Sequence, residues 1–300
     1  MTLALIAGAG ALPGLIAARQ PERPYVASLS GFAPDGLTSD LTFRIEHLGS
    51  ALQTLKAEGI TRLCLIGKVS RPAVDPAQID DLTKPLVPRM MAAMAEGDDG
   101  ALRGLMAILE EAGFALVGAH EIAADLLPPE GLLVGALGPT SEADAARAEG
   151  IVEAMGAADI GQACIVAGGQ ALAIEALPGT DHMIGTLLLA DAGQGASGLG
   201  DPIGMAADWL TGNEAESVPA RKRNPVLPKG GLLYKAPKPG QELRADMPTI
   251  GPTTVRLAAE AGLDGIVIAA GGVLLAEEAQ CRDIASAHGL FLWVRPRGAA

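Results

Sequence analysis

The sequence predicts an α/β protein of two domains: an N-terminal Rossmann-like parallel sheet and a C-terminal α/β domain with a mixed sheet. The chain has 300 residues, about twice the usual length of one domain. Hydrophobic residues make up 49% of it and aromatic residues only 3%, so Ala, Val, Leu and Ile must fill the cores, as in helices packed on parallel strands. Short apolar runs also alternate with helical patterns along the chain, which favours parallel strands joined by helices.

In the first half, apolar runs predict the strands and amphipathic patterns predict the helices between them. Strands are expected at residues 3–7, 25–30, 62–67 and 114–118, with a weaker candidate at 43–47. Helices are expected from the turn Gly8-Ala9-Gly10 through Ala18, and at 52–58, 84–95 and 100–111. This order of elements is typical of a parallel sheet covered on both faces.

A domain boundary is predicted where Pro128, Pro129 and Pro139 interrupt the pattern, giving domains at 1–134 and 135–300. Beyond it, helices are expected at 141–155, 253–261 and 277–288, and strands at 163–167, 171–176, 265–269, 273–276 and 290–294. Residues 191–229 are rich in Gly, Ser and Pro and predict a flexible insertion, either a tolerated disordered segment or a lid.

Charge and cysteine usage exclude several classes of protein. The net charge of −13 argues against sequence-independent binding to nucleic acid, which needs a basic surface. The 3 cysteines are widely spaced and form neither a disulfide framework nor a zinc pattern, which favours a reducing compartment. The start lacks a signal-type pattern, and no apolar run reaches the roughly 18 residues of a membrane span, so we expect a cytoplasmic protein.

Two polar turns follow predicted strands and suit a phosphate. Gly8 and Gly10 precede a helix, whose first N–H groups are unpaired and bind anions. The dinucleotide pattern is incomplete because Pro13 interrupts it and residues 28–30 include no ribose-binding acid, so NAD is disfavoured. In the second turn, Lys68, Ser70 and Arg71 offer two cations and a hydroxyl. Simple turns without a ligand remain the alternative for both.

Acidic and basic residues gather in two further segments. Asp98 and Asp99 open a helix, where one is expected to cap it and the pair could hold a metal or a ribose. Residues 235–251 combine three cations with two carboxylates, Glu242 and Asp246, between prolines that should display them. No His or Cys spacing suits zinc, so carboxylates and Mg²⁺ or Mn²⁺ are favoured. A salt-bridged surface loop is the alternative.

Seven motifs in this order resemble those of a known enzyme family. They are Gly8-x-Gly10-x-Leu12-Pro13, Gly67-x-Val69-Ser70-Arg71-Pro72, Gly97-Asp98-Asp99, Gly118-Ala119-His120-Glu121, Asp159-Ile160-Gly161-Gln162, Glu175 to Gly179-Thr180-Asp181, and Lys235-Ala236-Pro237-Lys238-Pro239 to Asp246-x-Pro248-Thr249-Ile250-Gly251. The chain resembles the UDP-2,3-diacylglucosamine pyrophosphatase family of lipid A biosynthesis, of the type that is not calcineurin-like.

The resemblance implies a divalent-cation-dependent hydrolase that binds its substrate between two domains. UDP-2,3-diacylglucosamine would give 2,3-diacylglucosamine 1-phosphate and UMP. The essential acid of the D-x-P-T-I-G motif falls on Asp246, which we expect to bind the metal together with Glu242. Substrate-binding residues are expected to be Gly8, Gly10, Ala11, Leu12, Lys68, Ser70, Arg71, Asp98, Asp99, Gly179, Thr180, Asp181, Lys235, Lys238, Gln241 and Thr249.

The lipid substrate sets expectations about partners. We expect the acyl chains in an apolar cleft between the halves, lined by aliphatic residues of the second domain, and transient contact with the inner membrane surface. A homodimer is left open. The alternative function is a nucleotide-sugar binding or regulatory protein without turnover, which would not need Asp246.

Overall fold

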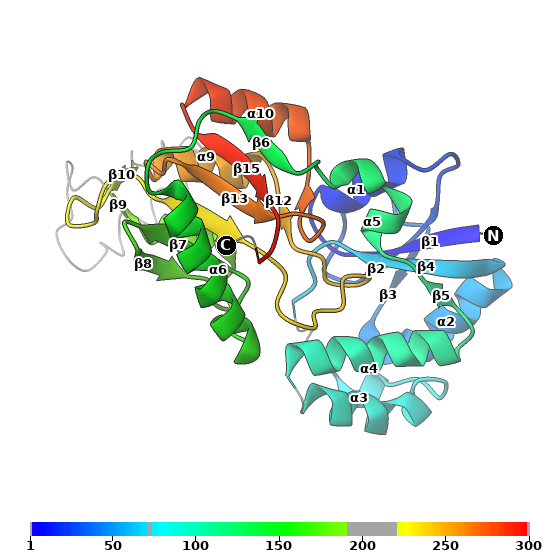
Figure 1. Cartoon of the computed structure of the whole chain (residues 1–300). Coiled ribbons are helices and arrows are strands. Elements are labelled where there is room, and N and C mark those ends of the chain that lie inside the picture. The colour runs from blue at the N-terminus through cyan, green and yellow to red at the C-terminus, as the bar shows by residue number, and fades with distance from the viewer. Residues whose placement is uncertain (1, 71–73, 96, 191–220, 299–300) are drawn as a thin grey trace, which may run out of the picture.

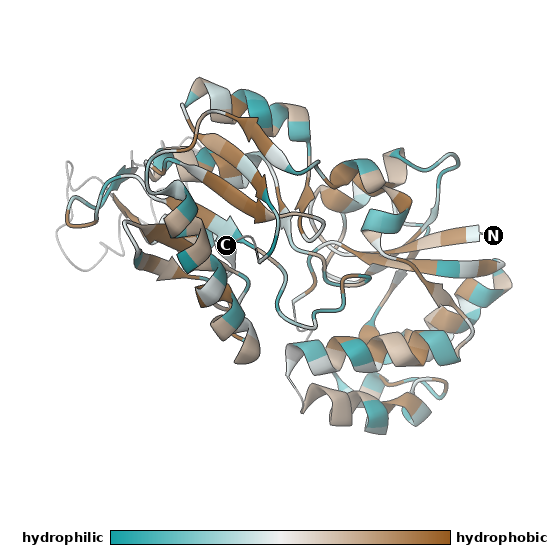
Figure 2. Cartoon of the chain, viewed as in Figure 1, coloured by the Kyte–Doolittle hydropathy of each residue, from teal (hydrophilic) through white to brown (hydrophobic). Residues whose placement is uncertain are grey.

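The computed structural model describes residues 2–70, 74–95, 97–190 and 221–298 and contains two main sheets, each packed against helices (Figure 1). Figure 2 shows the hydrophobic residues concentrated in the strands and on the helix sides that face them. Within the described residues, no helix is both long and apolar enough to cross a bilayer.

The first sheet is parallel throughout, as predicted. Its order is β3-β2-β1-β4-β5, with strands β1 Thr2–Ala7, β2 Tyr25–Leu29, β3 Leu41–Phe43, β4 Ile60–Ile66 and β5 Ala115–Leu116. Its helices are α1 Leu12–Ala18, α2 Leu48–Ala57, α3 Val87–Met94, α4 Asp98–Glu111 and α5 Ala119–Ile122. The strand order reverses between β1 and β4, and ligands of open α/β sheets bind beyond the carboxyl ends of strands at such a point.

Alternating side chains of these strands fill two cores. Ala4 and Leu63 belong to the cluster under α2 and α4, whereas their neighbours Leu5 and Cys64 belong to the cluster on the opposite face. Burial of both faces explains why these strands read as continuous apolar runs. The second cluster also contains Leu274, a fully buried residue from the far half of the chain.

The second sheet is mixed, also as predicted. Its order is β6-β15-β13-β11-β7-β8, with strands β6 Gly131–Val134, β7 Ala163–Ala167, β8 Gln170–Ile174, β11 Leu232–Lys235, β13 Gly265–Ala269 and β15 Phe291–Arg295. Strands β11, β13 and β15 are parallel to one another, and the remaining pairings are antiparallel. Its helices are α6 Ser141–Ala157, α7 Thr180–Gly185, α9 Pro252–Glu260 and α10 Glu278–Ala287.

Smaller elements complete the described chain. Two short ladders pair β9 Leu188–Ala190 with β10 Arg221–Arg223, and β12 Thr249–Ile250 with β14 Leu274–Leu275. Short 3₁₀ helices lie at Ile45–His47, Pro76–Gln78, Lys84–Leu86 and Ala124–Leu126.

Several details differ from the sequence-based expectations. Strand β6 pairs with β15, so residues 131–134 lie with the second sheet and the predicted boundary after 134 comes too late. The candidate strand at 43–47 ends at Phe43, because the chain turns there into a 3₁₀ helix. The strand expected at 273–276 pairs with β12 rather than with the main sheet. Of the predicted insertion at 191–229, residues 221–223 form β10, and 191–220 lie outside the described residues.

The loop of residues 236–248, between β11 and β12, crosses from the second half to the first. Figure 1 shows this yellow-orange segment between the two sheets. Ala245 and Met247 pack against the two cores of the first half. At Arg244, Nη1 reaches Glu110 Oε1 of α4 at 2.9 Å. The loop with the densest polar motif is thus held between the domains.

Candidate active site

The turns after β1 and β4 meet at the point where the strand order reverses. The backbone N–H of Ala9 donates to the Lys68 carbonyl, and the Lys68 N–H donates to the Ala9 carbonyl, each at 2.9 Å. A Cβ at Gly67 would lie only 2.7 Å from the Gly8 carbonyl oxygen, so glycine is required for this close approach. Lys68 and Ser70 are exposed at this edge. The two predicted phosphate turns therefore form one surface.

Lys235 ends β11, a central strand of the sheet in the second half. Its side chain is buried, against the expectation that the prolines after it would display it. Lys235 Nζ donates to Thr180 Oγ1 at 2.7 Å. Burial lowers the pKa of Lys235, and Lys68 lowers it further, while three nearby carboxylates oppose the change.

Thr180 also forms a hydrogen bond with a second buried residue, Glu175. Its Oγ1 donates to Glu175 Oε1 at 2.5 Å, and Glu175 Oε2 accepts the backbone N–H of Gln162 at 3.0 Å. Glu175 and Thr180 are both buried. The residues Lys235, Thr180 and Glu175 therefore form a continuous polar chain in the interior.

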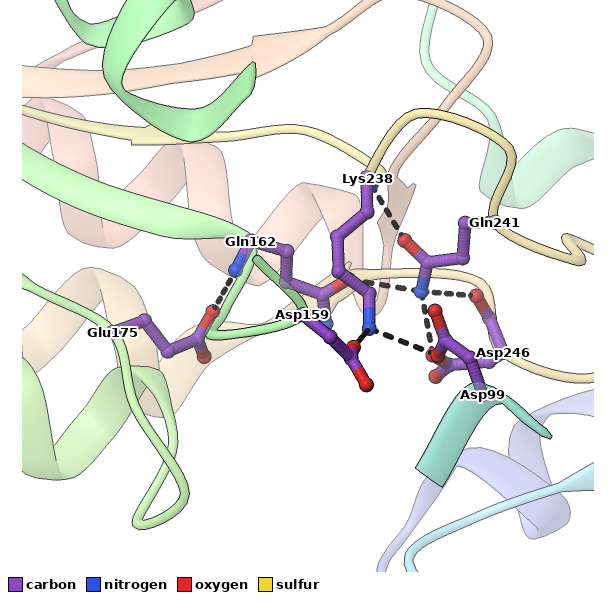
Figure 3. A network of polar contacts seen from close by, with 7 residues as sticks. All are labelled: Asp99, Asp159, Gln162, Glu175, Lys238, Gln241 and Asp246. Carbon is purple, nitrogen blue, oxygen red and sulfur yellow. Dashed lines mark hydrogen bonds and ion pairs between the residues drawn. The ribbon is translucent and has the colours of Figure 1, made fainter. Parts of the chain in front are cut away.

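Lys238 joins the two halves through a pair of carboxylates. Its Nζ lies 2.9 Å from Asp99 Oδ1, at the start of α4, and 2.5 Å from Asp159 Oδ1, after α6 (Figure 3). Burial disfavours the charge of Lys238, but the hydrogen bonds with Asp159 and Asp99 outweigh this and raise its pKa. Asp159 has a φ of 52°, a left-handed conformation that is uncommon for Asp and that places its carboxylate at this contact.

Asp246 lies beside this ion pair. Gln241 Nε2 donates to Asp246 Oδ2 at 2.5 Å and also to the Gln162 side-chain oxygen at 3.1 Å. Burial raises the pKa of Asp246 and the Asp99 charge acts in the same direction, while the Gln241 hydrogen bond opposes them. A carboxylate in such surroundings is suited to accept a proton or bind a cation.

Glu242 does not take part in this cluster. Arg244 binds both of its oxygens, with Nε to Oε1 at 2.9 Å and Nη2 to Oε2 at 2.8 Å. The hydrogen bond from Arg244 lowers the pKa of Glu242. The expectation that Glu242 binds a metal with Asp246 is therefore not supported by the geometry, since the guanidinium already occupies the carboxylate.

The remaining predicted residues fall into three groups. Gly179 and Asp181 lie at the start of α7, where Asp181 Oδ1 accepts the Thr254 hydroxyl at 2.9 Å. Thr249 lies in β12, and its hydroxyl donates to the Met247 carbonyl. The last group comprises Gly10, Ala11 and Leu12 before and at the start of α1, Asp98 as first residue of α4, and Arg71, which lies outside the described residues.

A cavity of about 450 Å³ elsewhere between the halves contains none of these residues. It is lined by Arg19, Asp125, Leu126, Leu275, Glu277, Glu278, Ala279 and Gln280. Its mixed and partly acidic lining does not match the apolar cleft expected for acyl chains.

Sequence reasoning named no role for Asp159, Gln162 or Glu175, which the structure places within the polar network. Their signal was present in the motifs Asp159-Ile160-Gly161-Gln162 and Glu175 to Asp181. Close packing explains the glycine between them, since a Cβ at Gly161 would lie 2.4 Å from the Glu175 carbonyl oxygen. The spacing alone does not reveal which partner each side chain binds.

Fold and site together define a two-domain α/β protein with a charged site between the domains, at the carboxyl ends of strands from both sheets. The family model of the LpxI N-terminal domain matches residues 2–126, and that of the LpxI C-terminal domain matches residues 129–199 and 210–293. The chain is 34% identical over 297 residues to the UDP-2,3-diacylglucosamine pyrophosphatase LpxI of Caulobacter vibrioides, covering 97% of this chain and 96% of that protein. The chain belongs to the LpxI family, which confirms the resemblance seen in its motifs.

Proposed function

We propose that this protein hydrolyses the pyrophosphate bond of UDP-2,3-diacylglucosamine to 2,3-diacylglucosamine 1-phosphate and UMP, a step of lipid A biosynthesis. The observation that carries the proposal is the near full-length match to the Caulobacter pyrophosphatase. The site geometry supports it, because Lys238 joins the two halves through Asp99 and Asp159, beside the partly buried carboxylate of Asp246.

The proposed arrangement follows the chemistry of each part. The nucleotide lies against the joined turns at Gly8 and Lys68, beyond the reversal in strand order. The buried ammonium of Lys235 stabilises charge on the pyrophosphate as the bond breaks. Asp246, whose pKa burial raises, accepts a proton from the attacking water or orients it.

We propose Mg²⁺ or Mn²⁺ as the cofactor, held by Asp246 with Asp99 as the second carboxylate, which would bind through Oδ2 because Lys238 Nζ contacts its Oδ1. The donor chemistry fits, because Mg²⁺ in phosphate enzymes is bound through one or two carboxylates, substrate phosphates and water. Within the described residues, no cluster of three or more His, Cys, Asp or Glu is arranged to hold a metal without the substrate. When bound, the cation would neutralise charge on the phosphate oxygens.

We propose that the protein works in the cytoplasm and meets its lipid substrate by transient contact with the inner membrane. Leu177, in the loop before α7, is 92% exposed, and Val69, in the β4 turn, is 53% exposed. Val69 follows Lys68, and Leu177 lies between Glu175 and Thr180 in the sequence, so we assign both to the acyl chains. Their contact with lipid would recover apolar surface that now faces water.

A single-turnover assay of Asp246→Ala tests the function. The variant should bind UDP-2,3-diacylglucosamine and melt at the wild-type temperature but release no UMP. Wild-type protein that binds the substrate without releasing UMP in Mg²⁺ would favour a nucleotide-sugar binding protein instead. A normal rate in the variant would remove Asp246 from the mechanism. A lowered melting temperature that accompanies the loss of activity would indicate a structural role.

A further inference from the structure

The buried chain that ends at Lys235 contains a carboxylate with no direct contact to the proposed reaction. Glu175 follows the edge strand β8, and its side chain turns inward rather than to solvent. Its Oε1 accepts the Thr180 hydroxyl at 2.5 Å, and its Oε2 accepts the Gln162 N–H at 3.0 Å. Both oxygens are occupied, so the carboxylate is fixed in orientation.

Thr180 is oriented by its two neighbours. Its only hydroxyl hydrogen goes to Glu175, so the oxygen lone pairs are left to accept from Lys235 Nζ at 2.7 Å. A serine could reproduce this relay, whereas a valine of the same shape could not. The contact uses one of the three N–H donors of Lys235.

Charged groups from four segments of the chain act on Lys235. Glu175 after β8, Asp181 on α7 and Asp246 in the 236–248 loop favour the protonated form, while Lys68 after β4 disfavours it. Glu175 is the carboxylate that hydrogen bonds through Thr180 join to Lys235. In a low-dielectric interior, removing this negative charge disfavours the protonated lysine.

Gln162 connects this chain to the other end of the site. Its backbone N–H holds Glu175 while its side-chain oxygen accepts from Gln241, which in turn binds Asp246 (Figure 3). The spacing between Lys235 and Asp246 is therefore set by one continuous set of hydrogen bonds.

We propose that Glu175 is a positioning residue for hydrolysis: through the Thr180 hydroxyl, its carboxylate keeps the buried Lys235 ammonium charged and directed toward the bound pyrophosphate. The proposal rests on the proposed function for the identity of the substrate. It predicts that removing the Glu175 charge changes the pH dependence of turnover rather than only its size.

The first experiment compares pH profiles of kcat/KM for UDP-2,3-diacylglucosamine in Glu175→Gln and wild type. We expect the alkaline limb to move to lower pH by about one unit, as one charge-assisted contact is lost. Activity below that limb should return toward the wild-type value. Glu149→Gln, which removes a half-buried carboxylate paired with Arg295 in the same half, should leave the profile in place. An equal loss at every pH in Glu175→Gln would overturn the proposal.

Two threonine variants keep the proposal testable if Glu175→Gln does not fold. The alkaline limb should lie at lower pH in Thr180→Val than in Thr180→Ser, because only the valine lacks the hydroxyl that joins Lys235 to Glu175. Identical profiles in the two variants would contradict the relay.

A readout without catalysis separates this proposal from the proposed function. In protein carrying ¹³Cε-lysine, the Lys235 resonance, assigned by its loss in Lys235→Met, should titrate at lower pH in Glu175→Gln and unchanged in Glu149→Gln. An unchanged midpoint in Glu175→Gln refutes the role of Glu175. Absence of UMP release by wild type, with the midpoint shifted, refutes the hydrolysis and leaves the electrostatic coupling standing.

Discussion

Removing the positive charge of Lys238 should weaken the connection between the two halves by a measurable amount. The side chain is 11% exposed and lies 2.9 Å from Asp99, which is 26% exposed. Two unit charges at about 4 Å gain about 4 kcal/mol at an effective dielectric constant of about 20. The partial exposure of both side chains and the entropy lost in ordering them reduce this Coulomb energy. Hydrogen bonds to charged groups typically contribute about 1.5–3 kcal/mol, which sets an upper range for the pair. We expect a coupling energy of about 1–2 kcal/mol between the two residues.

A double-mutant cycle in urea, followed by circular dichroism at low salt, measures this coupling. The cycle uses Lys238→Met, Asp99→Asn and the pair, since the excess over additivity isolates their interaction. A matched cycle on Lys84 and Asp81 provides the control, because that ion pair has a shorter separation of 2.7 Å but side chains that are 64% and 93% exposed. A Lys238–Asp99 coupling no larger than the control would refute the inference that burial gives this pair its strength.

Three further outcomes are expected. Hydrolysis should stop in excess EDTA and return with Mg²⁺ or Mn²⁺, and full activity in EDTA would contradict the proposed metal dependence. Glu242→Gln should show the same metal requirement as wild type, because Arg244 already binds the Glu242 carboxylate. Hydrogen bonds from Arg44 and Asp75 lower the pKa of buried Glu46 from 4.5 to about 2, so the ionised Glu46 stabilises the fold above pH 4.5 and this stabilisation is lost as the pH falls toward 2. In urea titrations, Glu46→Gln should lower the free energy of unfolding by about 2 kcal/mol at pH 7 and should reduce its dependence on acid pH. Leu177→Ser should lower kcat/KM for the diacylated substrate about tenfold without changing the melting temperature, and equal rates would remove Leu177 from lipid binding.

The strands that the sequence predicts well are those that bury both faces. Apolar runs identify β1, β4 and β13 because both faces of these strands pack against other parts of the same domain. Strand β11 was missed, since it has only 4 residues and ends in Lys235, which its proline-rich surroundings made look exposed. Strand β6 was missed because its partner β15 lies far along the chain, and local pattern says nothing about such pairing.

The site was predictable to a similar degree. The motifs place Asp246, Lys238 and Asp99 in candidate segments, because glycine, proline and charge mark them. Their partners depend on tertiary contacts: Asp159 approaches Lys238 only when α6 ends beside the 236–248 loop. The sequence pattern also favoured Glu242 as a metal ligand, because the hydrogen bonds from Arg244 to its carboxylate form only in the folded loop.

Leu274 gives the molecule a cooperativity that its two-domain sequence does not suggest. The residue comes from the second half and is fully buried in a core of the first, beside Leu5 and Val117. A fragment ending before β6 would therefore carry an unfilled apolar site, at a cost of the order of several kcal/mol for a leucine-sized void. The two family models meet between residues 126 and 129, and we expect this boundary to divide the sequence without dividing the unfolding unit. The intact chain should therefore melt in one transition, because contacts with the second half contribute part of the stability of the first half.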